Sequence, residues 1–229
     1  MKHKVWIIAL GGILSGLGAE AQLVRRPSVS ATGRVSVFAT PDQVRIDATV
    51  TTVGMTAQDA TAQNATTMNA LLAALQKVIG ATGDIRTINF NVYPVYKNGP
   101  NQTQVISGYS ASNTVEVTLA GTTLIGPVID AASQNGASSV GSLQFGLKDA
   151  DPSRVQALRL ATQQAKAHAD SMAAATGHVV GNIIAIQEAG TTPTPVYNTP
   201  VSGAGASSTT VLPGTLEIQA TVTLEAELN

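Results

Sequence analysis

The residues of this chain that could do chemistry are few, and the most suggestive are His168, Asp170 and His178. Their imidazole nitrogens and carboxylate oxygens are donors that a transition metal accepts. His178, however, follows Gly177, which ends a predicted helix, so the turn would have to fold back to bring the three together. We therefore expect His168 to be solvated, and we assign no metal ligand and no cofactor.

Three other arrangements invite a catalytic interpretation. Asp149 and Asp151 could form a carboxylate pair for acid/base work, but Asp151 followed by Pro152 is typical of a helix N-cap. Pro41-Asp42 lies between two runs of alternating apolar residues in "GRVSVFATPDQVRIDATVTTVG". The pair could be either the floor of an active site or the corner of a hairpin. Turn chemistry favours the corner. No Ser/His/Asp grouping is indicated by spacing, so we expect no catalytic residue.

Known motifs and composition exclude further classes of protein. The chain lacks G-x-S-x-G, H-E-x-x-H and a calcium-loop pattern, and its "GAGASS" does not lie between a strand and a helix. It contains no cysteine, which removes disulfides and thiolate sites. No basic block is present, so nucleic acid is not an expected partner.

The first 21 residues have the pattern of a cleaved secretory signal. Lys2 and Lys4 precede an apolar run from Val5 to Gly18, and Ala19-Glu20-Ala21 is a small-x-small site before Gln22. The alternative, a transmembrane anchor, needs about 20 apolar residues, and this run is shorter and rich in glycine. Removal of 21 residues from the 229 leaves 208, enough for one domain over 22–229 with a formal charge of −2 and no transmembrane span.

Strand and helix periods alternate along the first half of the mature chain. Apolar alternation on both sides of Pro41-Asp42 predicts a hairpin with one buried face. Thr56 and Asp59 have the spacing of a capping box at the start of a helix over about 56–79. A strand over 88–92 and its returning partner over 115–119 follow.

The second half predicts a helix over about 123–133, a strand over 143–147, a helix from Asp151 to Gly177 and strands over 183–187 and 216–228. The uncharged segment 189–214, rich in Pro, Thr, Ser and Gly, is expected to be a mobile loop or a docking arm. The third helix is expected to pack on its sheet through a narrow seam formed by Val155, Leu158, Thr162, Ala165, Ala169, Met172 and Thr176.

These elements predict an α+β domain in the order ββαββαβαββ. Strict alternation over the last strand is typical of an antiparallel sheet with one wet face. We expect a largely antiparallel, twisted sheet with about three helices packed on one face.

The order and spacing of these stretches resemble the SIMPL-domain family of exported bacterial periplasmic or outer-membrane antigens and oxidative-stress defence proteins. The resemblance rests on "VSATGRVSVFATPDQVRIDATVTTVG", "DIRTINFNVYPVY", "GYSASNTVEV", "QFGLKD" and "ATVTLEAEL", and it covers nearly the whole mature chain. The chain matches the family at Gly33, Pro41, Asp42, Ile85, Thr87, Gly108, Tyr109 and Asn113. We interpret each of these residues as structural. A binding role stays open for Tyr109 and Asn113.

The resemblance implies an assembly protein more than an enzyme, because the family has no established catalytic residues and its members are thought to form ring-like periplasmic oligomers. We therefore expect a non-enzymatic, self-assembling envelope protein linked to stress defence, periplasmic or associated with the outer membrane. Its partners would be further copies of itself or another envelope protein. Two alternatives stay open: a stress factor that binds a small ligand or unfolded protein, and an unrecognised hydrolase.

Overall fold

A computed structural model describes residues 26–98, 103–190, 193–196, 211 and 213–229. The predicted signal sequence and "GAGASS" lie outside these residues. The described part of the chain contains three helices and eight strands, in the order β1 (Ser28–Ala39), β2 (Gln43–Gly54), α1 (Ala57–Ile79), β3 (Gly83–Asn98), β4 (Gln104–Ala120), α2 (Ile125–Gln134), β5 (Ser139–Gly146), α3 (Asp151–Ala175), β6 (Val180–Glu188), β7 (Pro193–Val196) and β8 (Thr215–Leu228).

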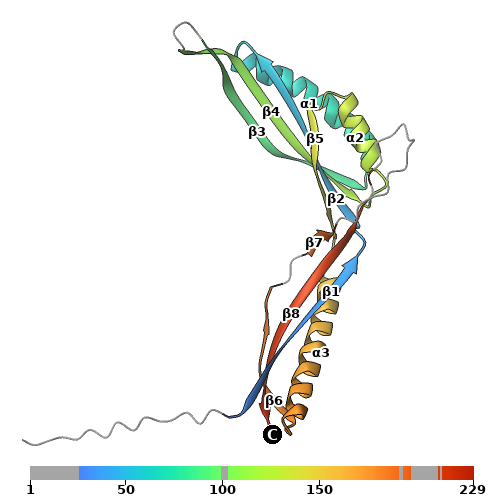
Figure 1. Cartoon of the computed structure of the whole chain (residues 1–229). Coiled ribbons are helices and arrows are strands. Elements are labelled where there is room, and N and C mark those ends of the chain that lie inside the picture. The colour runs from blue at the N-terminus through green and yellow to red at the C-terminus, as the bar shows by residue number, and fades with distance from the viewer. Residues whose placement is uncertain (1–25, 99–102, 191–192, 197–210, 212) are drawn as a thin grey trace, which may run out of the picture.

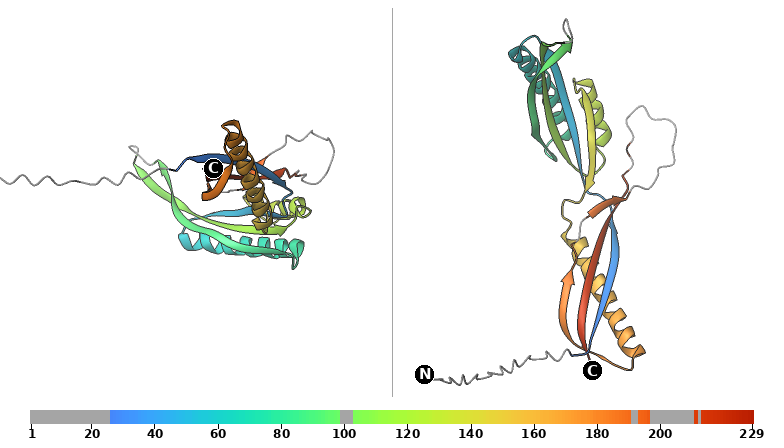
Figure 2. Two further views of the ribbon diagram at one scale, coloured as in Figure 1. Left: turned by 90° about the horizontal axis from the view of Figure 1, so that it is seen from below. Right: turned by 60° about the vertical axis from the view of Figure 1, so that its left-hand side comes forward.

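The strands form two antiparallel sheets that lie end to end (Figures 1 and 2). One sheet has the order β3-β4-β2-β5 and is covered on one face by α1 and α2; we call this half the upper lobe. The other has the order β1-β8-β6, with β7 also paired to β8, and is covered by α3; we call it the lower lobe. The α+β class, the antiparallel pairing and the three helices are confirmed, although the strands divide between two sheets.

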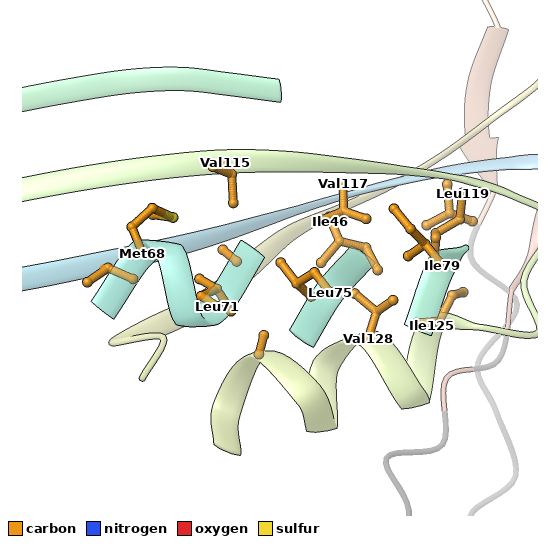
Figure 3. Packing of buried hydrophobic residues seen from close by; sticks show 14 residues of the cluster. Ile46, Met68, Leu71, Leu75, Ile79, Val115, Val117, Leu119, Ile125 and Val128 are labelled. Carbon is orange, nitrogen blue, oxygen red and sulfur yellow. The ribbon is translucent and has the colours of Figure 1, made fainter. Parts of the chain in front are cut away.

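The upper lobe has the larger core because its strands and helices bury branched side chains against one another. The apolar positions of β2 and β4 alternate toward α1, which places Leu71, Leu75 and Ile79 on them at helical spacing, and Ile125 and Val128 of α2 complete the cluster (Figure 3). Thr56 caps α1, since its Oγ1 accepts a 3.1 Å hydrogen bond from the backbone N–H of Asp59. This start of α1 is as predicted.

The predicted hairpin at Pro41-Asp42 is wrong. β1 pairs with β8 and β2 pairs with β4 and β5, so the chain crosses from the lower to the upper lobe at Thr40–Asp42 without reversing (Figure 1). Alternation fixes which face of a strand is buried but not which strand lies beside it. The first strand finds its partner in the last one, over twelve residue pairs from Ser28 and Glu227 to Ala39 and Leu216.

Asp42 hydrogen-bonds this crossing to two other segments, one that follows β4 and one that follows β5. Its backbone N–H donates to Gly146 O (3.2 Å), and its carbonyl accepts from Gly121 N (2.7 Å). Its carboxylate Oδ1 accepts a 2.6 Å hydrogen bond from the backbone N–H of Lys148, in the segment that leads from β5 back to α3. The Pro-Asp pair is therefore structural, but it holds a junction between the lobes.

The buried stripe of α3 matches the predicted seam only at Ala165 and Ala169. It consists of alanines four residues apart: Ala157, Ala161, Ala165, Ala169 and Ala173. Val155 and Met172, predicted to be buried, are 63% and 42% exposed. The alanines let the helix lie very close to β1 at Gly33, where an added Cβ would be 2.6 Å from Ala165 N and nearer still to Ala161 O.

Two smaller predictions also need correction. Asp151 is the first residue of α3 and not its N-cap: Ala150 holds that position, and the Asp149 carboxylate accepts a 3.0 Å hydrogen bond from Asp151 N. The segment predicted as a loop over 189–214 contains β7, which pairs with the start of β8. Residues 191–192, 197–210 and 212 of that segment lie outside the described residues.

The junction can be tested with Asp42→Ala and Asp42→Asn. The alanine variant removes the acceptor for Lys148 N and should lower the free energy of unfolding by about 1–2 kcal/mol. Asparagine keeps an acceptor oxygen and should lose less. Denaturant unfolding gives the energies, and hydrogen exchange at the Lys148 amide checks the cause. Unchanged exchange in Asp42→Ala would show that the bond does not secure the junction.

The close approach of α3 can be tested with Gly33→Ala. The new methyl group meets the α3 backbone, which cannot rotate away as a side chain could, so we expect a loss of about 3 kcal/mol. Gly141→Ala in β5 is the matched control, because a Cβ there meets no atom within 4 Å. Equal melting temperatures for the two variants would contradict the packing described here.

Candidate functional site

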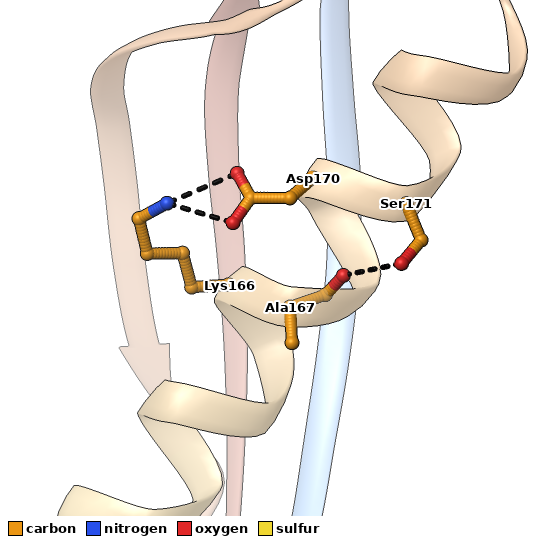
Figure 4. A network of polar contacts seen from close by, with 4 residues as sticks. All are labelled: Lys166, Ala167, Asp170 and Ser171. Carbon is orange, nitrogen blue, oxygen red and sulfur yellow. Dashed lines mark hydrogen bonds and ion pairs between the residues drawn. The ribbon is translucent and has the colours of Figure 1, made fainter.

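The residues that could have bound a metal do not converge. The exposed His168 donates from Nδ1 to Thr32 O of β1 (3.0 Å), so it makes a structural contact and is not only solvated. Asp170 is paired with Lys166 one turn earlier, at 2.8 and 3.0 Å, as Figure 4 shows. His178 donates to Thr176 O within its own turn (2.9 Å). Among the described residues, no cluster of three His, Asp or Glu side chains could hold a metal ion.

Three hollows in the described surface are open to solvent. Alanines are half of the residues that line a hollow of 640 Å³ between α1 and α2, and a hollow of 500 Å³ lies beside His168 where β1 meets α3. The smallest, 230 Å³, lies at the junction beside Asp42, Asp84 and Lys148. All three charged side chains are exposed there, and the Asp42 carboxylate is already bonded to Lys148 N. Such a surface does not hold a ligand in one orientation.

The two positions left open for binding lie in β4. Asn113 faces α1 with its Oδ1 buried, in the same register as Val50 of β2. Beside it, the fully buried Asn64 of α1 donates from Nδ2 to Val50 O (2.9 Å) and Ala111 O (3.1 Å). The Asn64 amide thus joins α1 to the sheet, which is a structural role. The buried Oδ1 atoms of Asn64 and Asn113 accept no hydrogen bond within the described residues. Tyr109 pairs with Gly54 and Pro94 across the neighbouring strands.

The most distinctive surface is one that the sequence analysis did not identify. The β3 and β4 strands extend together past the end of β2, as two strands alone over 95–98 and 104–108 (Figure 1); residues 88–98 and 104–109 are here called the arm. Phe90, Tyr93 and Tyr96 are each about half exposed. Further exposed apolar side chains on the arm are Ile88, Val92, Val105 and Ile106. From Thr87 to Val115, Lys97 is the only charged residue.

Aromatic side chains stand on both faces of this arm. Phe90 and Val92 pair with Asn113 and Ala111, and so share the face covered by α1. Tyr93 lies on the opposite face, in a row with Ser110 and Val53. An exposed strand that carries aromatic side chains on both faces and almost no charge is typical of a surface that binds another polypeptide.

The arm also presents the free backbone edge of β3. Within the described residues no strand pairs with its outer side, and its register with β4 is regular from Asn89 to Val95. A regular, apolar edge strand is ready to add another strand.

The other sheet edges are protected. On β1, Gln164 Oε1 accepts from Arg34 N (2.6 Å) and His168 donates to Thr32 O, so side chains of α3 occupy that edge. β5 contains Ser142 at a positive φ of 49° beside a register shift, and β6 has two register shifts. β7 has only four residues. Bulges and covered edges prevent unwanted pairing, so β3 is the most open edge of the described structure.

The three helices of the described part are α1, α2 and α3. None of them combines the length and the apolar composition that spanning a bilayer requires.

Comparison with known proteins places this arm and its sheet in a family. The "26 kDa periplasmic immunogenic protein" of Brucella melitensis is 27% identical over 191 residues, which cover 80% of this chain and 75% of that protein. The "Uncharacterized protein YggE" of Escherichia coli K12 is 26% identical over 188 residues, 82% of this chain and 76% of that protein. The SIMPL family profile, described as "Protein of unknown function (DUF541)", matches residues 29–226. Because that match spans most of the sequence and both lobes, the chain belongs to the SIMPL family.

Proposed function

We propose that this protein is a non-enzymatic component of the bacterial cell envelope that is exported to the periplasm and assembles with itself into a ring-like oligomer. The observation that carries the proposal is the arm, whose apolar side chains and free β3 edge are exposed in the single chain. Burial of such a surface against another polypeptide is favourable, and the near absence of charge lowers the desolvation cost.

Export is supported by the first 21 residues, which have the pattern of a cleaved signal, and by the printed name of the Brucella relative, a periplasmic immunogenic protein. The link to stress defence rests on the family resemblance. The physical role that fits it is a scaffold in the envelope, because exposed apolar side chains of the arm offer a surface for assembly.

A second candidate is capture of unfolded polypeptides by the same edge. A free, regular strand edge pairs with any extended segment through backbone hydrogen bonds, and sequence preference comes only from the side chains beside it. This candidate predicts a single chain that binds extended apolar peptides.

Self-assembly can be tested by light scattering on the mature chain. We expect the mass of several subunits, and we expect the double variant Phe90→Lys, Tyr93→Lys to fall to the mass of one. Assembly of the variant would bury unpaired ammonium groups, which costs several kcal/mol. Val155→Lys, on the exposed outer side of α3, is the control and should leave the mass unchanged.

Circular dichroism should be the same for the wild type and both variants, because none of the three lysines replaces a buried side chain. A wild-type protein of one-subunit mass across the concentration range would refute self-assembly. A wild-type oligomer whose mass is unaffected by the two lysines would place the contact outside the arm.

A further inference from the structure

The arm's geometry points to a particular contact. We infer that β3 pairs antiparallel with β3 of a second copy about a two-fold axis that passes beside Asn91, so that the two upper sheets become one continuous sheet of eight strands. This inference rests on the proposed self-assembly through the arm and adds the partner strand, the register and the symmetry.

Pairing is confined to the regular part of β3. One register shift precedes Asn89 and another follows Val95, so the regular segment of β3 covers residues 89–95. Pro94 lacks a backbone N–H, so a ladder is most favourable when that residue lies at its end. An antiparallel ladder over Asn89–Tyr93, centred on Asn91, meets both conditions.

This register brings matching side chains together. In a two-fold antiparallel pair centred on Asn91, Phe90 of each copy lies opposite Val92 of the other. Both side chains lie on the face covered by α1, so four apolar groups form one cluster there. Aromatic and β-branched residues are favourable cross-strand partners.

On the face away from α1, the side chains of the two copies are also suitable partners. Asn91 lies across from its own copy, and Tyr93 of each chain lies across from Asn89 of the other. Amide and phenol groups can donate and accept hydrogen bonds, so these pairs can bond to one another. Ser112 and Ser110, the β4 neighbours of Asn91 and Tyr93, are hydroxyl residues and continue this polar surface.

Charge does not oppose the contact. The ladder itself has no charged residue, and Lys97 lies six positions from the centre, so the two lysines would be about 40 Å apart. Arg86, which precedes the ladder in β3, is already paired with Glu116, at 2.6 Å between Nη2 and Oε1. A second copy therefore meets no like charge along the ladder, which supports β3 itself as the occupant of this edge.

The alternative partner edges within a second copy are less suitable. β1 has side chains of α3 bonded to its backbone, and the strands β5 and β6 are interrupted by register shifts. Two-fold pairing of β3 is isologous and closes at two chains. A larger ring would then be built from such pairs, and its mass should be an even multiple of the subunit mass.

The absence of native cysteine allows a direct test by oxidation of single-cysteine variants. Asn91→Cys should form a disulfide-linked dimer in high yield, since opposed residues in antiparallel strands have Cα atoms about 4.5–5.5 Å apart, within disulfide range. Asn89→Cys and Tyr93→Cys are matched controls on the same face. Each alone should give at least tenfold less dimer, and a mixture of the two should restore it.

A second measurement keeps the test independent of disulfide geometry. A nitroxide label on Lys97→Cys should give a dipolar distance of about 40 Å between two copies, as measured by pulsed electron paramagnetic resonance. Light scattering on the same samples reports whether an oligomer is present.

The outcomes separate the two proposals. An oligomer that gives neither the Asn91→Cys dimer nor the label distance would overturn the β3 pairing and leave self-assembly standing. An oligomer in which a β3 cysteine crosslinks only to a β5 cysteine such as Gln144→Cys would replace the two-fold contact with a head-to-tail one. A protein of one-subunit mass, including one that binds extended peptides, would remove both proposals.

Discussion

The pairing of the first strand with the last is the constraint on which the rest of the structure depends. β1 and β8 join residues about two hundred positions apart in sequence, over the full length of β1. Once β1 is held against β8, its continuation at Thr40–Asp42 has to leave the lower sheet, and β2 becomes a central strand of the upper one. The loop-closure entropy of such a contact is large, and the lower lobe offsets it by burying both strands under α3.

That lower lobe is stabilised by close approach and not by large side chains. Its helix contributes a row of alanines, and Gly33 removes the one side chain that would hold the helix away from β1. Gln164 and His168 can then form hydrogen bonds with the β1 backbone. The close approach that packs the core of the lower lobe therefore also covers the free edge of β1. The upper lobe follows the more usual pattern, in which Leu71, Leu75 and Ile79 fill the space between a helix and a sheet.

The two lobes consequently differ in how far the backbone edges of their sheets are protected. The proposed assembly through β3 follows from this difference. Backbone edges of β1, β5 and β6 are covered or irregular, whereas β3 combines a regular segment over 89–95 with exposed apolar groups and almost no charge. Proteins protect free edges because pairing there is indiscriminate. An edge left open in a chain that protects the others supports the proposal that β3 pairs with another chain.

The sequence by itself determined the local elements and much of their burial. Alternation gave β2, β4 and β8, helical spacing gave α1, and Thr56 with Asp59 marked the start of that helix, because these signals depend only on neighbours in the chain. The family, too, could be predicted from the order of short motifs. Only the tertiary structure decided that Pro41-Asp42 is a junction between two sheets, that the alanines of α3 and not Val155 face the sheet, and that β3 is the open edge. Strand partners, helix rotation and edge protection depend on groups distant in sequence, such as Lys148 beside Asp42 and His168 beside Thr32, and no local period encodes those distances.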